Sequence, residues 1–113
     1  MLLLSTSVFS QTAKPSVDDM RNEIKAALRE KSANKAISNI ISDSKTAIEV
    51  AEPILFKIYG KDNILGERPY NVYFVDGYWL VSGSLPKKYN VGGTFSIILS
   101  AKDGQVIKLI HYK

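Results

Sequence analysis

Apolar side chains recur every three or four residues along two segments of the chain, the spacing typical of α-helices with one buried face. The first segment runs from about residue 16 to residue 31. Its apolar positions are Val17, Met20, Ile24, Ala27 and Leu28. Ser16 and Asp19 have the spacing of a capping box, with Asp in place of the usual Glu or Gln. We therefore expect a capped helix whose other face carries charged residues.

A second helix is predicted to begin near Asp43 or Ser44, because either side chain can accept hydrogen bonds from the first turn. Its apolar face comprises Ala47, Val50, Ala51, Ile54, Leu55 and Ile58. Pro53 lies inside this pattern and predicts a kink or local break, and Gly60 predicts the end of the helix. The segment between the two helices, residues 32–44, is rich in Ser, Asn and Asp, and it fits either a short helical turn or a loop.

From Pro69 to His111 the pattern changes to runs of β-branched and aromatic residues, which favour strands. Asp76-Gly77 and Asp103-Gly104 are two-residue signals for tight hairpin turns, because such turns need positive φ angles. These signals predict an antiparallel meander of about four strands. The first hairpin should pair residues 70–76 with residues 78–84.

Helices followed by an antiparallel meander indicate an α+β domain, with two N-terminal helices packed on a strongly twisted sheet of about four strands. A sheet that curls around a helix would form a half-open cone with a pocket at its wide end. The length of 113 residues allows one small domain with a single core. We expect residues 11–42 to form a linker and an N-terminal helical extension, and residues 43–113 to form the α+β domain.

Residues 1–10 form an uncharged apolar run that is too short to span a bilayer. The run ends in Val8-Phe9-Ser10, which places small or aliphatic residues at the −3 and −1 positions of a cleavage site before Gln11. The basic residues that usually open such a segment are missing, so it matches an incomplete export signal. We expect export, cleavage after Ser10 and a periplasmic location. The alternative, an N-terminal strand in a cytoplasmic protein, predicts burial of Leu3, Val8 and Phe9.

Composition and charge exclude several classes of protein. The chain is 45% hydrophobic and 23% charged, which is ordinary globular composition. The net charge of +4 is spread along the chain without a basic block, so we expect no nucleic-acid partner. Because there is no cysteine, disulfides, thiolate nucleophiles and cysteine-ligated metal sites are excluded.

Candidate catalytic residues are scarce. His111 is the only histidine, and a lone histidine supplies too few ligands for a metal site. A catalytic histidine needs a carboxylate that positions it, and Asp76 and Asp103 are better explained as turn residues. The glycines lack the spacing of a phosphate-binding loop. We therefore predict no catalytic, cofactor-binding or metal-binding residue.

Aromatic residues of the first hairpin separate by face. Strand alternation places Tyr73 and Val75 on one face and Val72 and Phe74 on the other, while Tyr78 and Leu80 oppose Trp79 and Val81. One face should be core, and the other should meet solvent or a partner. Trp and Tyr are common interface anchors, and Lys87-Lys88-Tyr89 follows Pro86 on an expected loop. The candidate partner-binding residues are Tyr73, Tyr78, Trp79, Lys87, Lys88 and Tyr89.

The order and spacing of several short motifs resemble one known family. These are the segments Ala47 to Leu55, Ile58-Tyr59-Gly60, Arg68-Pro69-Tyr70, the G-x-W-x-V-x-G-x-L-P run from Gly77 to Pro86, Gly92-Gly93, and Asp103 to Val106. Together they are similar to the small immunity proteins with the nuclear-transport-factor-2-like (cystatin-like) fold of bacterial polymorphic toxin systems. The resemblance covers about residues 43–113. Leu80 and Ser84 stand where valine and threonine would be more usual.

The resemblance implies a cone-shaped α+β domain without enzymatic activity or cofactor, which binds a cognate protein toxin and blocks its active site. Two alternatives stay open. An exported small-ligand-binding protein of the same fold would need a pocket lined by Trp79 and Tyr73 with convergent polar groups. An enzyme of this fold would need a buried histidine or aspartate, and here only His111 could serve.

Overall fold

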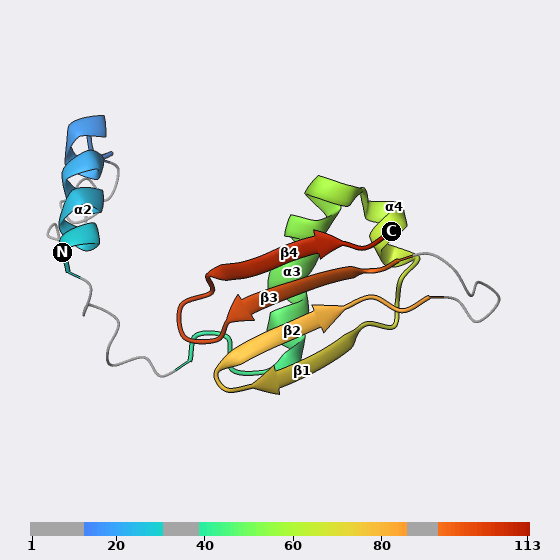
Figure 1. Ribbon diagram of the computed structural model, residues 1–113. Helices are drawn as coiled ribbons and strands as arrows, with labels where there is room; N and C mark the ends of the chain where they lie inside the picture. The colour runs from blue at the N-terminus through green and yellow to red at the C-terminus, as the bar shows by residue number, and fades with distance from the viewer. Residues whose placement is uncertain (1–12, 31–38, 86–92) are drawn as a thin grey trace, which may run out of the picture. The chain divides into compact units, whose positions relative to one another are not determined.

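The computed structural model of the chain describes residues 13–30, 39–85 and 93–113 (Figure 1). The chain divides into two units, Met1–Ala36 and Ile37–Lys113. The expected export segment, residues 1–10, lies outside the described residues.

The described part of the first unit contains helix α2, Val17–Arg29. The predicted capping box is confirmed: the Ser16 hydroxyl accepts a hydrogen bond from the Asp19 amide, and the Asp19 carboxylate accepts one from the Ser16 amide, both at 3.1 Å. No residue of α2 is buried. Its apolar positions Val17, Met20, Ile24 and Leu28 are exposed.

The second unit begins with helix α3, Ser44–Tyr59, which is followed at once by the short helix α4, Lys61–Leu65. Asp43 caps α3 by accepting a hydrogen bond from the Thr46 amide at 2.8 Å. The helix continues through Pro53, so the alternative of a local break is wrong. Gly60 ends α3 with a φ of +92°, as its position predicted, and also begins α4, which no sequence pattern predicted.

Four antiparallel strands form one sheet in the order β1-β2-β3-β4. Their bounds are β1 Asn71–Val75, β2 Tyr78–Ser82, β3 Phe95–Ser100 and β4 Val106–His111. The expected register of the first hairpin is confirmed, because Val75 pairs with Tyr78 across the turn. At that turn Asp76 and Gly77 both have positive φ angles, of 52° and 86°. The α+β prediction is confirmed.

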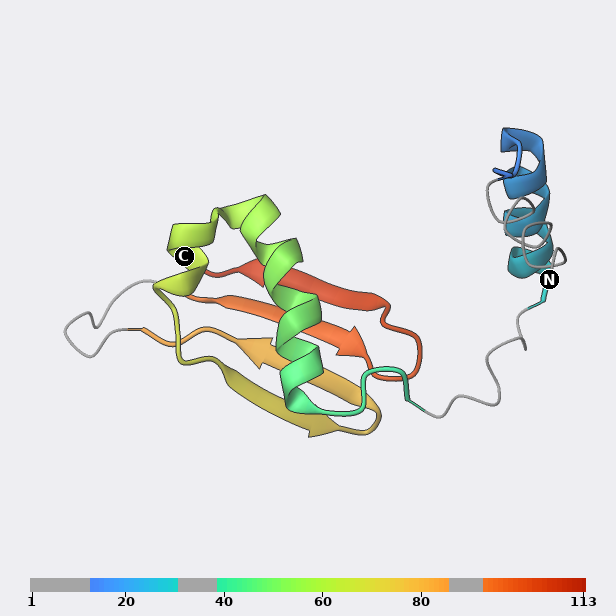
Figure 2. The same ribbon diagram turned by 180° about the vertical axis from the view of Figure 1, so that it is seen from behind.

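Helix α3 crosses one face of the sheet (Figure 2), and the core lies between them. The core residues are Ile41, Ala47, Ala51, Leu55, Ile64, Trp79, Val81, Phe95, Ile97, Leu99 and Ala101. The Trp79 indole N–H donates to the Ile41 carbonyl at 2.8 Å, which fixes the segment before α3. For the segment between the two helices, a short helical turn and a loop were both open. Residues 39–43 are not helical, and residues 31–38 lie outside the described residues.

Glu67, between α4 and β1, connects several elements of the second unit. Its side chain is buried, and Oε1 accepts a hydrogen bond at 2.9 Å from the amide of Phe95, the first residue of β3. Its carbonyl accepts another from the Ser84 amide at 2.8 Å. Gly83 leaves the space for this carboxylate: a Cβ there would meet Glu67 Oε1 and lie 2.8 Å from Glu67 Cβ. Glycine is therefore required after β2 for steric reasons.

We predict that Gly83→Ala lowers the free energy of unfolding by about 2 to 3 kcal/mol, because the added methyl group must displace a buried, hydrogen-bonded carboxylate. Urea unfolding measures the change. The matched control is Gly66→Ala, where φ is −66° and the nearest atoms are 3.4 Å from the added Cβ. That variant should differ from wild type by less than about 0.5 kcal/mol. Equal effects of the two substitutions would contradict the steric role of Gly83.

Candidate functional site

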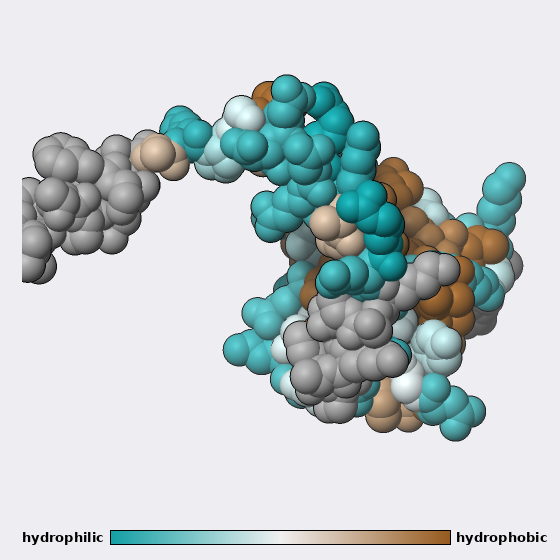
Figure 3. Space-filling model, turned by 90° about the vertical axis from the view of Figure 1, so that its left-hand side faces the viewer, coloured by the Kyte–Doolittle hydropathy of each residue, from teal (hydrophilic) through white to brown (hydrophobic). Residues whose placement is uncertain are grey.

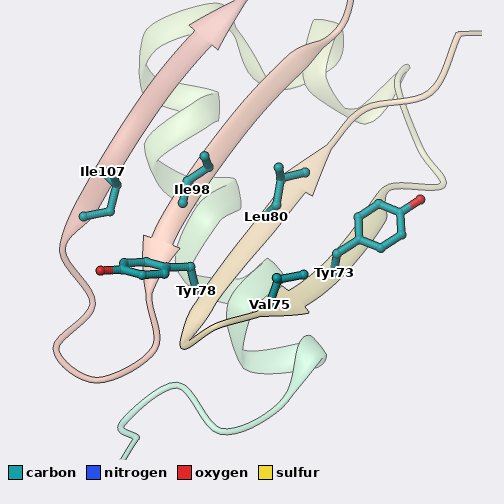
Figure 4. Close-up of a pocket in the computed structure, with 6 residues that line it drawn as sticks. All are labelled: Tyr73, Val75, Tyr78, Leu80, Ile98 and Ile107. Atoms are coloured by element: carbon teal, nitrogen blue, oxygen red, sulfur yellow. The ribbon is translucent and has the colours of Figure 1, made fainter.

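The face of the sheet opposite α3 carries a contiguous apolar surface that we call the open face. Its residues come from all four strands and line a shallow hollow of about 450 Å³ (Figure 4). They are Tyr73, Val75, Tyr78, Leu80, Ile98 and Ile107. The register aligns Tyr73, Leu80 and Ile98 in one row across three strands. Hydrophobic side chains also gather on the right-hand side of Figure 3, the side toward which this face is turned.

The open face differs from the outer face of an ordinary antiparallel sheet, which is usually polar. Tyr73, Val75 and Tyr78 are 57%, 60% and 45% exposed. None of the six residues carries a charge, and the two tyrosine hydroxyls are their only side-chain polar groups. Such a surface is almost wholly apolar. It can bind another apolar surface, and exposed apolar patches of this kind mark interaction sites.

The predicted contact residues separate into three groups. Tyr73 and Tyr78 lie on the open face. Trp79 points to α3 and is only 8% exposed, so its selection as a contact residue is corrected: its indole is committed to the core and to the Ile41 carbonyl. The three loop residues, Lys87, Lys88 and Tyr89, lie outside the described residues.

The contact prediction missed four open-face residues: Val75, Leu80, Ile98 and Ile107. Alternation had already placed Val75 and Leu80 on the same face as the two tyrosines, so that signal was sufficient to include them. Ile98 lies in the apolar run Phe95 to Leu99, in which alternation is not visible. For Ile107 the register shift opposite Ile98 and Leu99 breaks the simple period of two.

His111, the only histidine, lies beside Glu67 at the end of β4, where both line a hollow of about 360 Å³ together with Tyr59 and Asn63. The imidazole Nε2 is 2.8 Å from Glu67 Oε2, and Nδ1 is 2.9 Å from the Tyr112 carbonyl oxygen. A carbonyl oxygen only accepts, so Nδ1 donates; Nε2 faces a carboxylate and donates as well. The geometry therefore suits a ring that carries both protons.

Electrostatics agree with this geometry. The hydrogen bond to Glu67 raises the pKa of His111 above its ordinary value of 6.5, burial acts in the opposite direction, and the Tyr112 carbonyl adds to the rise. With both ring nitrogens donating, neither has a free lone pair with which to accept a proton. The arrangement is that of a cross-brace between Glu67 and the end of β4, not that of a general base. His111 therefore shows no sign of the catalytic role that an enzyme of this fold would need.

A second polar cluster joins α3 to the segment before β1. The Tyr70 hydroxyl donates to Glu52 Oε2 at 2.6 Å, and Arg68 Nη2 lies 2.6 Å from the same oxygen. Burial and the hydrogen bond to Glu52 raise the pKa of Tyr70 to about 12. Burial alone would raise the pKa of Glu52, but the hydrogen bonds from Tyr70 and Arg68 outweigh it and lower that pKa. The Arg68-Pro69-Tyr70 motif therefore holds the start of β1 against the helix.

A metal-binding cluster and a membrane-spanning helix are both absent from residues 13–30, 39–85 and 93–113, the part of the chain that the structure describes. No group of three or more His, Asp or Glu side chains there could hold a metal ion. Within the same ranges, none of the helices combines the length and the apolar character that crossing a membrane requires.

We predict that the pKa of His111 lies above 6.5 in the native protein and falls toward that value in Glu67→Gln. Because the chain has a single histidine, its ring C–H signals in an NMR titration are unambiguous. The raised pKa means that the protonated ring stabilises the fold below the unfolded-state pKa. This stabilisation is lost as the pH rises through the folded-state pKa.

Urea unfolding between pH 6 and pH 9 checks the same pair independently. The stability difference between wild type and His111→Gln should be largest at pH 6, about 1 to 2 kcal/mol, and should shrink toward pH 9. Parallel stability curves for the two proteins would contradict the brace.

Known proteins match most of this chain. The chain is 29% identical over 93 residues to the uncharacterized protein YhhH of Escherichia coli K12, an alignment that covers 81% of this chain and 73% of the relative. It is 28% identical over 78 residues to the uncharacterized protein YbbC of the same organism, with 69% and 64% covered. No solved structure matches. The family model described as NTF2 fold immunity protein matches residues 46–113. The chain therefore belongs to the family of NTF2 fold immunity proteins.

Proposed function

We propose that this protein is a non-enzymatic immunity protein that binds a cognate bacterial toxin through the open face and blocks access to the toxin's active site. Family membership supports a toxin-neutralising role in general. The observation that supports the choice of surface is the uncharged hollow across all four strands, in which Tyr73 and Tyr78 are about half exposed. The apolar area of such a surface is removed from water only when a partner covers it.

The alternative of an exported small-ligand-binding protein receives less support. That interpretation needs Trp79 and Tyr73 in one pocket with convergent polar groups. The two side chains lie on opposite faces of the sheet, since Trp79 packs in the core and Tyr73 lines the open face. The hollow is shallow and apolar, which suits a protein surface better than a small polar ligand.

An enzymatic role also receives less support, because the one histidine is engaged at both ring nitrogens. Steric occlusion requires only affinity and position, and it makes no demand on titratable groups. The even distribution of the +4 net charge gives no support to a nucleic-acid partner.

For location, we propose export to the periplasm with removal of residues 1–10. The support is the uncharged apolar run and its Val8-Phe9-Ser10 ending. A periplasmic immunity protein would meet a toxin that arrives in or acts on the cell envelope.

Co-expression with a candidate toxin tests the proposed function. We predict that Tyr78→Glu weakens toxin binding about a hundredfold and abolishes protection, because it buries an unpaired carboxylate in an apolar interface. Binding is measured by titration calorimetry, and protection by growth of co-expressing cells.

The matched control for this substitution is Ile58→Glu, which places the same charge at a 53% exposed apolar position of α3. It should keep both affinity and protection. Cells that die equally with and without the wild-type protein would refute immunity against that toxin. Equal loss of binding in both variants would refute the open face as the contact surface.

The proposed location predicts a mature chain that begins at Gln11 in the periplasmic fraction. N-terminal sequencing of the native protein from fractionated cells decides the matter. An intact Met1 in the cytoplasmic fraction would refute export, and it would allow a toxin with a cytoplasmic target.

A further inference from the structure

Strands β1 and β4 form the two edges of the sheet (Figure 1), and they differ in how well they are protected. Natural proteins guard edge strands with charges, prolines or bulges, because an unprotected edge pairs with other strands. β4 carries Lys108 and lies opposite the register shift at Ile98/Leu99. β1, Asn71–Val75, carries no charge, no proline and no register shift. It is therefore the unprotected edge.

Exposed apolar side chains of β1 lie on both faces of the strand. Tyr73 and Val75 belong to the open face. Phe74 points to the opposite face and contacts the Trp79 ring at 4.8 Å between centroids, yet it stays 48% exposed. A partner that covered the open face alone would leave Phe74 in water. An occupant of the edge itself would cover side chains on both faces.

The backbone of β1 specifies what kind of occupant fits. In a two-residue hairpin the closing pair, here Val75 and Tyr78, exchanges hydrogen bonds, and such pairs alternate along the ladder. The N–H and C=O groups of Val72 and Phe74 are therefore directed away from β2. Within the described residues, β1 pairs with β2 alone. An added β-strand satisfies these groups, and apolar side chains on both of its faces would match those of β1.

We propose that a second copy of this chain occupies the edge, with the two β1 strands antiparallel across a two-fold axis perpendicular to the sheet. Val72 then pairs with the partner's Phe74, and Tyr73 lies opposite its own counterpart. The axis keeps both open faces on the same side, so the apolar surface becomes continuous across the dimer. The dimer does not depend on the proposed toxin binding.

Charge complementarity favours this occupant and its antiparallel orientation. Within Asn71–Val75 there is no charge, so no like charges come opposite one another. Asp76 follows the C-terminal end of β1 and Arg68 precedes its N-terminal end, so the antiparallel arrangement brings the carboxylate end of each strand toward the cationic end of the other. The Arg68 side chain is 54% exposed although it pairs with Glu52, so it remains accessible to a second carboxylate. The symmetry creates two such contacts.

Disulfide trapping tests the dimer directly, because the full chain has no cysteine. Tyr73 occupies a non-hydrogen-bonded pair across the axis, for which a Cα separation of about 4.5 Å permits a disulfide. Under mild oxidation Tyr73→Cys should cross-link to a covalent dimer at least about tenfold faster than Ile107→Cys, which is similarly exposed on β4.

The register has its own control. Asn71→Cys mixed with Val75→Cys should cross-link faster than either variant alone, because residue 71 lies opposite the partner's residue 75. In sedimentation velocity at rising concentration the wild type should dimerise, whereas Tyr73→Lys, folded by circular dichroism, should stay monomeric. Equal cross-linking of the Tyr73 and Ile107 variants, or a wild type that stays monomeric, would overturn the proposal. So would a Tyr73→Cys that cross-links to a cysteine-bearing toxin and not to itself, which would assign the edge to the toxin.

Discussion

The buried carboxylate of Glu67 is the constraint on which the sheet depends. Burying a charge is costly unless it is paired and hydrogen-bonded. Here Phe95 donates to one carboxylate oxygen and His111 to the other, so both are satisfied. The three residues belong to the segment before β1, the start of β3 and the end of β4. One side chain thus fixes the end of the sheet, and it fits only because Gly83 lacks a side chain.

The sheet fixed in this way has two apolar faces, one buried and one exposed. Trp79 and Val81 of β2 turn to α3 and are buried, while Tyr78 and Leu80 of the same strand turn away from it. One helix of 16 residues and the short α4 cover only one face. The structure therefore buries the side of the sheet that faces α3 and leaves the open face and the β1 edge exposed.

Local signals predicted most of this fold. The capping residues Ser16 and Asp43 predicted where α2 and α3 begin, and Asp76-Gly77 predicted the register of the first hairpin. The Glu67 brace could not be predicted, because its partners lie 28 and 44 residues away and no local pattern encodes such contacts. Alternation likewise divided the hairpin residues into two faces but could not say which face α3 would cover. That is why Trp79 was selected as a contact residue together with Tyr78.

The motif by which the chain resembles its family now has a physical interpretation. In G-x-W-x-V-x-G, Gly77 forms the turn, Trp79 and Val81 fill the core, and Gly83 accommodates Glu67. The fixed letters of the strand therefore build the fold, whereas the intervening positions point to the open face, where Tyr78 and Leu80 line the hollow. Leu80, which stands where valine would be more usual, is one of these intervening residues. The motif thus specifies the scaffold, and the contact surface proposed above depends on side chains that the motif leaves open.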